Sequence, residues 1–133
     1  MKALSLLLMV TLLLWGDATW SDEYEKAFQS AQQQNKGVML MLTKKDCNAC
    51  IYMDNEVLSD PKIFHKLSQN FILLHLDIYK DDLHALEYMG TPTFYFMHAN
   101  GDIVERISGS RSIKKFDRLI DKVNVMMLEE DDD

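Results

Sequence analysis

Continuous apolar runs alternate along the chain with stretches in which apolar residues recur every three or four positions. Residues 38–42, 71–78 and 93–97 form the continuous runs, and their length is typical of strands buried in a sheet. The helical spacing is clearest in two stripes, Tyr24, Ala27, Phe28 and Ala31, and Ile113, Phe116, Ile120, Val123 and Met127. The pattern predicts a protein in which helices and strands alternate.

Local signals place the starts of two helices. Asp22 followed by Glu25 is a capping-box pattern ahead of the first stripe. Asp60-Pro61 predicts another start, with the acid as cap and the proline at the first helical position. Further helices are expected from about Cys47 to Leu58, over residues 82–88 and over residues 112–128.

Asn100-Gly101 predicts a tight hairpin of type I′, because both central positions of that turn need a positive φ. Residues 103–107 would then pair antiparallel with the preceding strand. The alternating strands and helices before them imply right-handed crossovers and parallel pairing. We therefore expect an α/β fold, with a central mixed sheet of about four strands and helices on both faces.

Length and composition narrow the function classes. The 133 residues fit one domain, and the hydrophobic fraction of 47% is that of a globular protein. The formal net charge of −7 argues against nucleic-acid binding, which needs a basic face. Two cysteines exclude a multi-disulfide scaffold and a four-cysteine zinc site.

The two ends of the chain differ from the rest in composition. Lys2, an apolar run and the small residues Gly16 and Ala18 predict a signal peptide over residues 1–18, with an uncleaved membrane anchor as the alternative. Export would place the cysteines where disulfides persist. Residues 19–128 would form the domain, and the acidic residues 129–133 a solvated tail.

The most informative motif is Cys47-Asn48-Ala49-Cys50, which follows a predicted strand and opens a predicted helix. The free N–H groups and the dipole at a helix start favour thiolate at the first cysteine, and thiolate is the attacking species in disulfide exchange. Cys50 lies one turn on, within reach of Cys47. A structural disulfide and a metal site are the alternatives, and a metal would need further ligands, which the scattered His65, His75, His84 and His98 do not supply.

Gly90-Thr91-Pro92-Thr93 comes just before the third continuous run. The Thr91–Pro92 bond is a candidate cis peptide, since cis is inexpensive only before proline. An ordinary trans proline at the start of a strand is the alternative.

Together these segments resemble the thioredoxin family over nearly all of the chain after the signal segment. The likeness rests on the strand before Cys47 and Cys50, on Thr91-Pro92, and on the strand, hairpin and helix that follow. Within the family, the chain most resembles the periplasmic thioredoxin-like proteins and the carboxy-terminal domain of DsbD. This likeness rests on Asp60-Pro61, which follows Cys50 by ten and eleven residues. The resemblance implies a thioredoxin fold, Cys47 as nucleophile, Cys50 as resolving cysteine, and a cis Pro92 that with Thr91 binds substrate.

Two positions depart from the family pattern. Asp46 stands where a tryptophan usually precedes the first cysteine, and Met41 stands where many members carry a buried acid thought to move protons for the second. The resemblance therefore leaves the proton route of Cys50 unassigned.

The sequence thus predicts an exported thiol-disulfide oxidoreductase that reduces protein disulfides through Cys47 and Cys50. We expect it to act as a monomer in a bacterial periplasm, without a bound cofactor or metal, and to receive electrons from a membrane thiol reductase. A disulfide oxidase or isomerase is the alternative within the fold, and a eukaryotic secretory location is the alternative compartment. The alternative from another class is a metal-binding or chaperone module without redox turnover.

Overall fold

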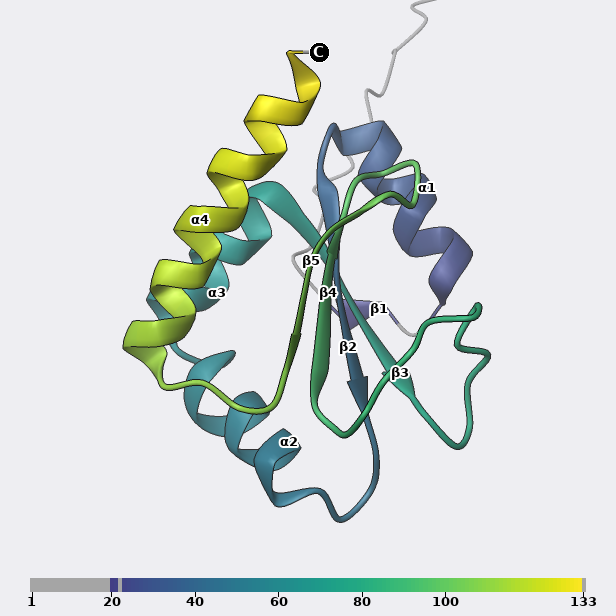
Figure 1. Ribbon diagram of the computed structural model, residues 1–133, viewed down its shortest axis with the longest axis vertical. Helices are drawn as coiled ribbons and strands as arrows, with labels where there is room; N and C mark the ends of the chain where they lie inside the picture. Colours follow the sequence, from purple (N-terminus) through teal and green to yellow (C-terminus); the bar gives the residue numbers. More distant parts are fainter. Residues whose placement is uncertain (1–19, 22, 133) are drawn as a thin grey trace, which may run out of the picture.

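The computed structural model describes residues 20–21 and 23–132, in which a five-stranded sheet lies between helices (Figure 1). Helix α1 covers one face of the sheet, and α2, α3 and α4 lie on the other. The elements in chain order are β1 Trp20–Ser21, α1 Tyr24–Gln34, β2 Gly37–Thr43, α2 Asn48–Tyr52, the π-helical η1 Met53–Val57, α3 Pro61–Asn70, β3 Phe71–Asp77, β4 Thr93–Met97, β5 Ile103–Ser108 and α4 Ile113–Asp131.

The sheet is mixed, in the order β1-β3-β2-β4-β5. Strands β1, β3 and β2 are parallel, whereas β4 runs antiparallel to β2 and to β5. The expected α/β architecture with helices on both faces is confirmed. The fifth strand is β1, whose two residues are too few to leave a periodic signal in the sequence.

Alternate residues of β2 divide the core into two layers. Met39 and Met41 face α2, η1, α3 and α4, while Val38, Leu40 and Leu42 face α1. All five are fully buried, as expected for a central strand covered on both sides. Removing such side chains from water contributes about 1.5–3 kcal/mol each.

Gly37 starts β2 where the sheet meets the end of α4. A Cβ atom there would lie 2.6 Å from the carbonyl oxygen of Met97 and 2.7 Å from Met127 Cε. The close approach of the β4 backbone therefore requires glycine at this position.

The expected helix over residues 82–88 is wrong, because this segment is a loop. His84 and Ala85 adopt left-handed backbone angles, with φ of 49° and 63°. The Asp82 carboxylate accepts the N–H of His84 at 2.8 Å, and the ring of Tyr24 stacks on that of His84. A side chain that bonds its own backbone two residues on competes with helix formation.

The hairpin between β4 and β5 lies where expected, but it is not a type I′ turn. The N–H of Gly101 donates to the carbonyl of His98 at 2.9 Å, and within the turn only Gly101 has a positive φ, of 95°. A three-residue loop with a left-handed glycine is the next commonest hairpin after the two-residue kind. Val104 falls at the register shift that follows, since Phe96 pairs with Glu105 and Met97 with Ile103.

Both terminal helices differ from expectation in detail. Glu23 caps α1 without a side-chain hydrogen bond, and Asp22 lies outside the described residues, as does the predicted signal segment. Helix α4 continues to Asp131, so most of the predicted acidic tail is helical, and Glu130 pairs with His98 at 2.5 Å. Ile113, expected on the buried stripe, is 41% exposed because it lies in the first turn.

Across the described residues, no helix is long and apolar enough to span a membrane.

Candidate active site

The end of β2 delivers Cys47 to the start of a helix. After Thr43 the exposed residues Lys44, Lys45 and Asp46 turn the chain, and Asp46 does so with a left-handed φ of 59°. Cys47 is the N-cap of α2, and its Sγ accepts the N–H of Cys50 at 3.1 Å. The backbone thus directs a hydrogen-bond donor at this sulfur.

Cys47 and Cys50 form a disulfide, with their Cα atoms 5.2 Å apart. The exposed fraction of Cys47 is 7% and that of Cys50 is 2%, so the first cysteine lies nearer to solvent. The spacing in the sequence predicted that the two sulfurs could meet, and they do.

Thr91 and Pro92 lie beside this disulfide because β4 begins where β2 ends. The register pairs Leu42 with Thr93, which brings the two preceding residues to the cysteines. The Thr91–Pro92 peptide bond is cis, and the N–H of Gly109 donates to the Pro92 carbonyl at 2.8 Å. All four residues singled out from the sequence, Cys47, Cys50, Thr91 and Pro92, therefore come together.

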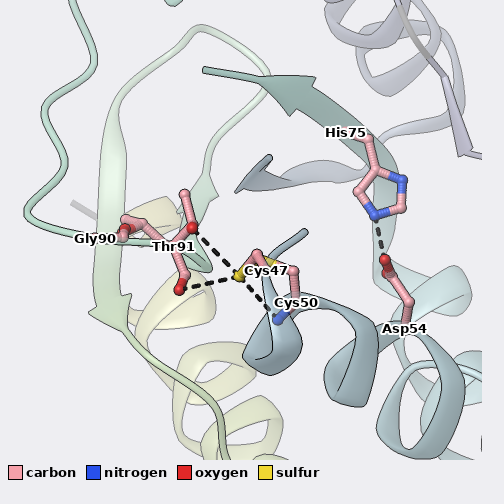
Figure 2. Close-up of a disulfide and its surroundings, with 7 residues drawn as sticks. Cys47, Cys50, Asp54, His75, Gly90 and Thr91 are labelled. Atoms are coloured by element: carbon pink, nitrogen blue, oxygen red, sulfur yellow. Dashed lines mark hydrogen bonds and ion pairs between the residues drawn. A yellow bond between two sulfur atoms is a disulfide. The ribbon is translucent and has the colours of Figure 1, made fainter. Parts of the chain in front are cut away.

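Polar atoms gather around the sulfur of Cys47, as Figure 2 shows. The Thr91 hydroxyl donates to Cys47 Sγ at 3.3 Å, and the Thr91 carbonyl oxygen lies 3.5 Å from the same sulfur. Together with the Cys50 N–H, two donors point at one sulfur atom. Hydrogen bonds of this kind stabilise a sulfur that carries negative charge.

Both cysteines belong to the buried cluster that contains Met41 and Met53. Cys50 lies deeper in it, with an exposed fraction of 2% against 7% for Cys47. The Met53 thioether accepts the N–H of Arg111 at 3.3 Å, which ties the loop before α4 to the helix of the cysteines. Met41 is fully buried in this cluster, so this position holds an apolar side chain that cannot accept a proton.

Two further features of the site were missed from the sequence. Asp54 Oδ1 on η1 lies 3.1 Å from His75 Nε2 on β3, beside the turn that carries Cys50 (Figure 2). The two residues are 21 positions apart in the sequence, so their contact cannot be predicted without the register of β3. The side chains of four residues close in sequence to the motifs are exposed and largely apolar, namely Ile51, Tyr52, Tyr88 and Met89.

The four histidines weighed as metal ligands have other contacts. Within residues 23–132, nowhere do three histidine, cysteine or acidic side chains gather as a metal site would need. His98 pairs with Glu130, and His65 contacts Gln69 on its own helix.

The chain is similar to solved structures of known proteins. A thioredoxin from Thermus thermophilus is 28% identical, with a TM-score of 0.71 over 80% of this chain and 86% of that chain. The reduced C-terminal domain of DsbD from Neisseria meningitidis is 17% identical, with a TM-score of 0.63 over 78% and 98%. The periplasmic thioredoxin SoxS from Paracoccus pantotrophus is 18% identical, with a TM-score of 0.58 over 69% and 99%.

The comparison with family models matches residues 24–124 to the thioredoxin-like domain, whereas no curated protein sequence matches the chain. That match spans strands β2 to β5, both cysteines and most of α4. Within the matched residues, the disulfide lies at the start of a helix and beside the turn into β4. The chain accordingly belongs to the thioredoxin-like family, and it is a thiol-disulfide oxidoreductase.

Proposed function

We propose that the protein is an exported reductant of protein disulfides, with Cys47 as nucleophile and Cys50 as resolving cysteine. The observation that carries the proposal is the unequal environment of the two sulfurs. Two hydrogen-bond donors point at Cys47, and Cys50 is buried among apolar side chains. The attacking sulfur must be the stabilised thiolate and must be accessible, which favours Cys47.

The reaction runs in two exchange steps. The Cys47 thiolate attacks one sulfur of the substrate disulfide, so a mixed disulfide forms and the other substrate sulfur leaves as thiolate. Cys50 then attacks the Cys47 sulfur, and the second substrate sulfur leaves with the electron pair of the broken bond. The substrate gains two electrons and two protons in total, and the protein ends with the Cys47–Cys50 disulfide.

The surroundings of the disulfide support a polypeptide as substrate. Thr91 and Pro92 present backbone beside Cys47, and we assign to them the binding of the substrate backbone. Met89, two residues before Thr91, is 98% exposed, and Ile51 next to Cys50 is half exposed. Exposed apolar side chains around a reactive group favour a protein partner over a small polar one.

Export is supported by the signal-like residues 1–18 and by the similarity to the periplasmic thioredoxin SoxS. In that compartment a closed Cys47–Cys50 pair needs an outside source of electrons. We assign this role to a membrane thiol reductase, by analogy with the similar DsbD domain. No bound cofactor takes part in the exchange steps.

The reducing direction follows from the charges near the motif. Asn48 and Ala49 carry no charge, and Asp46 adds a negative charge next to Cys47. A couple becomes oxidising when its thiolate is specially stabilised, and here the stabilisation is moderate. We expect a reduction potential near that of thioredoxin, about −270 mV, measured by equilibration with glutathione buffers.

Asp46→Asn removes the opposing charge and should make the couple more oxidising, and Lys45→Gln is the matched control of opposite sign. A wild-type reduction potential above about −180 mV, the value of protein disulfide isomerase, would contradict the reductant proposal and favour an oxidase or isomerase. A Cys47→Ser variant should lose exchange with the buffer altogether.

A further inference from the structure

Cys50 has a proton to lose when it attacks the mixed disulfide. It is 2% exposed and lies in the apolar cluster with Met41 and Met53, so solvent reaches it poorly. No carboxylate, histidine or lysine is buried in the described part of the chain, where Thr93 is the one buried polar residue. A proton acceptor for Cys50 must therefore stand at the edge of the cluster.

Asp54 and His75 stand at that edge. Asp54 follows Cys50 by four positions along α2 and η1, a spacing that places Cβ atoms about 5–6 Å apart on one helix face. His75 pairs in register with Met41, and by the alternation along β3 it shares a sheet face with Phe71 and Leu73 of the same cluster. The strand and the helix thus place both groups at the edge of the cluster that holds the resolving cysteine.

The two side chains form one unit. Asp54 Oδ1 lies 3.1 Å from His75 Nε2, and Figure 2 shows the ring and the carboxylate pointing toward each other. The exposed fraction of the side chain is 24% for His75 and 39% for Asp54, so the pair extends from the cluster to solvent.

We propose that the Asp54–His75 pair takes the proton of Cys50 as this cysteine attacks the mixed disulfide, an inference that rests on the proposed function. The Cys50–Cys47 bond forms while the bond from Cys47 to the substrate sulfur breaks, and the electron pair leaves on the substrate sulfur. The proton passes from Cys50 to the pair through one water and then to the substrate thiolate or to solvent. Asp54 receives the proton, and His75 acts as its positioning partner.

The other charged groups near His75 are engaged or exposed. Asp77, two residues further on the same face of β3, accepts the N–H of Tyr79 at 2.9 Å, and Asp81 accepts the N–H of Asp77. On η1, Glu56 is exposed. Strand β2 presents Met41 and Thr43 to this region, neither of which titrates.

The test measures the reaction of Cys47 and the later reaction of Cys50 as two separate steps. Reduced full-length protein reacts with dithiobis(nitrobenzoate), which releases one coloured thiolate when Cys47 attacks and a second when Cys50 resolves the adduct. We expect Asp54→Asn and His75→Gln to slow the second release about tenfold at neutral pH, since general acid–base catalysis contributes 10²–10⁴-fold for a base in direct contact. The first release should stay unchanged, Asp54→Glu should restore the second, and Glu56→Gln should match wild type.

The pH profile distinguishes proton transfer from a structural role. Hydroxide increasingly takes the place of the base as the pH rises, so the difference in rate between the variants and wild type should shrink steadily with rising pH. Variants that match wild type at neutral pH, or that are slowed equally at every pH or in both releases, would overturn the proposal. A wild-type protein that stops after one release would instead refute the proposed function, because Cys50 would not resolve the adduct at all.

Discussion

At the scale of single residues, Thr91 is the side chain that most directly affects the reactive sulfur. Its hydroxyl donates to Cys47 Sγ, while its carbonyl oxygen lies at a similar distance from the same atom. In the thiol form the Cys47 S–H can donate to that carbonyl, whereas in the thiolate form only the hydroxyl contact is favourable. The side chain of Thr91 therefore favours the charged form over the neutral one.

Replacing Thr91 by valine removes this donor with little change in shape. A hydrogen bond to a charged group contributes about 1.5–3 kcal/mol, so alkylation of Cys47 in the reduced protein at neutral pH should slow roughly tenfold. Limited reaction with iodoacetamide and mass spectrometry of the Cys47 peptide measure the rate. Thr91→Ser keeps the hydroxyl and should alkylate as wild type does, and equal rates for the valine and serine variants would contradict the assignment.

The residues of the site were partly accessible from the sequence alone. The spacing of Cys47 and Cys50 and the position of Pro92 before a strand were visible, because the residues of each motif are neighbours in the sequence. The contact of His75 with Asp54 depends on the register of β3 with β2, which hydrophobic pattern does not set. A polar pair that joins a strand to a distant helix thus becomes visible only in the folded chain.

At the scale of elements, Lys66 joins α3 to α4. Its Nζ lies 2.7 Å from Asp117 Oδ1 and 2.5 Å from Asp121 Oδ1. The hydrogen bond from Lys66 lowers the pKa of Asp117, with a smaller contribution from Lys62. The same hydrogen bonds, first to Asp117 and then to Asp121, raise the pKa of Lys66.

These shifts fix the pH window in which the link stabilises the fold. A carboxyl with a lowered pKa contributes stability above its unfolded value, near 3.9, and loses it as the pH falls through the folded value. A lysine with a raised pKa contributes below its unfolded value, near 10.4. Asp117→Asn should therefore unfold at slightly lower urea than wild type at pH 7, and the difference should shrink as the pH falls below the unfolded value and vanish once Asp117 is protonated in the folded protein.

Urea titrations at several pH values measure this difference. Glu129→Gln, which removes an exposed carboxylate of α4, is the control, and its difference from wild type should not change with pH in this way. A constant gap between Asp117→Asn and wild type down to low pH would show that the asparagine disturbs packing rather than the ion pair.

Most elements were predictable from hydrophobic pattern, and the exceptions have local causes. The runs that became β2 and β4 and the Asp60-Pro61 start of α3 followed the rules for buried strands and capped helices. The prediction of a helix over residues 82–88 was wrong because the Asp82 side chain accepts the backbone N–H of His84, a contact that competes with helix formation. The predicted type of the turn at Gly101 was wrong because the preference of the Asn-Gly dipeptide does not determine the length of the loop.

At the scale of the whole molecule, the chain order places all four site residues at one end of the sheet. Helix α2 follows the end of β2 at the bottom of Figure 1, and the turn into β4 lies next to it. The C-terminus lies at the opposite end of the view. The first 18 residues, the predicted signal segment, are outside the described structure.

We predict that expression of the full chain in a bacterium with a periplasm yields a mature protein that begins at Thr19. The apolar run and the small residues before Thr19 suit signal peptidase, and the mass of the protein in the osmotic-shock fraction measures the cut. Leu8→Arg interrupts the apolar run and should leave an uncleaved cytoplasmic chain. A full-length product in the membrane fraction would show an anchor in place of a signal peptide.

The disulfide also gives the molecule a simple chemical stoichiometry. The chain contains two cysteines in all, and both are in the Cys47–Cys50 bond. The oxidised form therefore has no thiol to titrate and the reduced form has two, so a thiol count reads the redox state directly. Any covalent dimer on a non-reducing gel must likewise use one of these two sulfurs, and each such band reports a molecule whose pair has been opened.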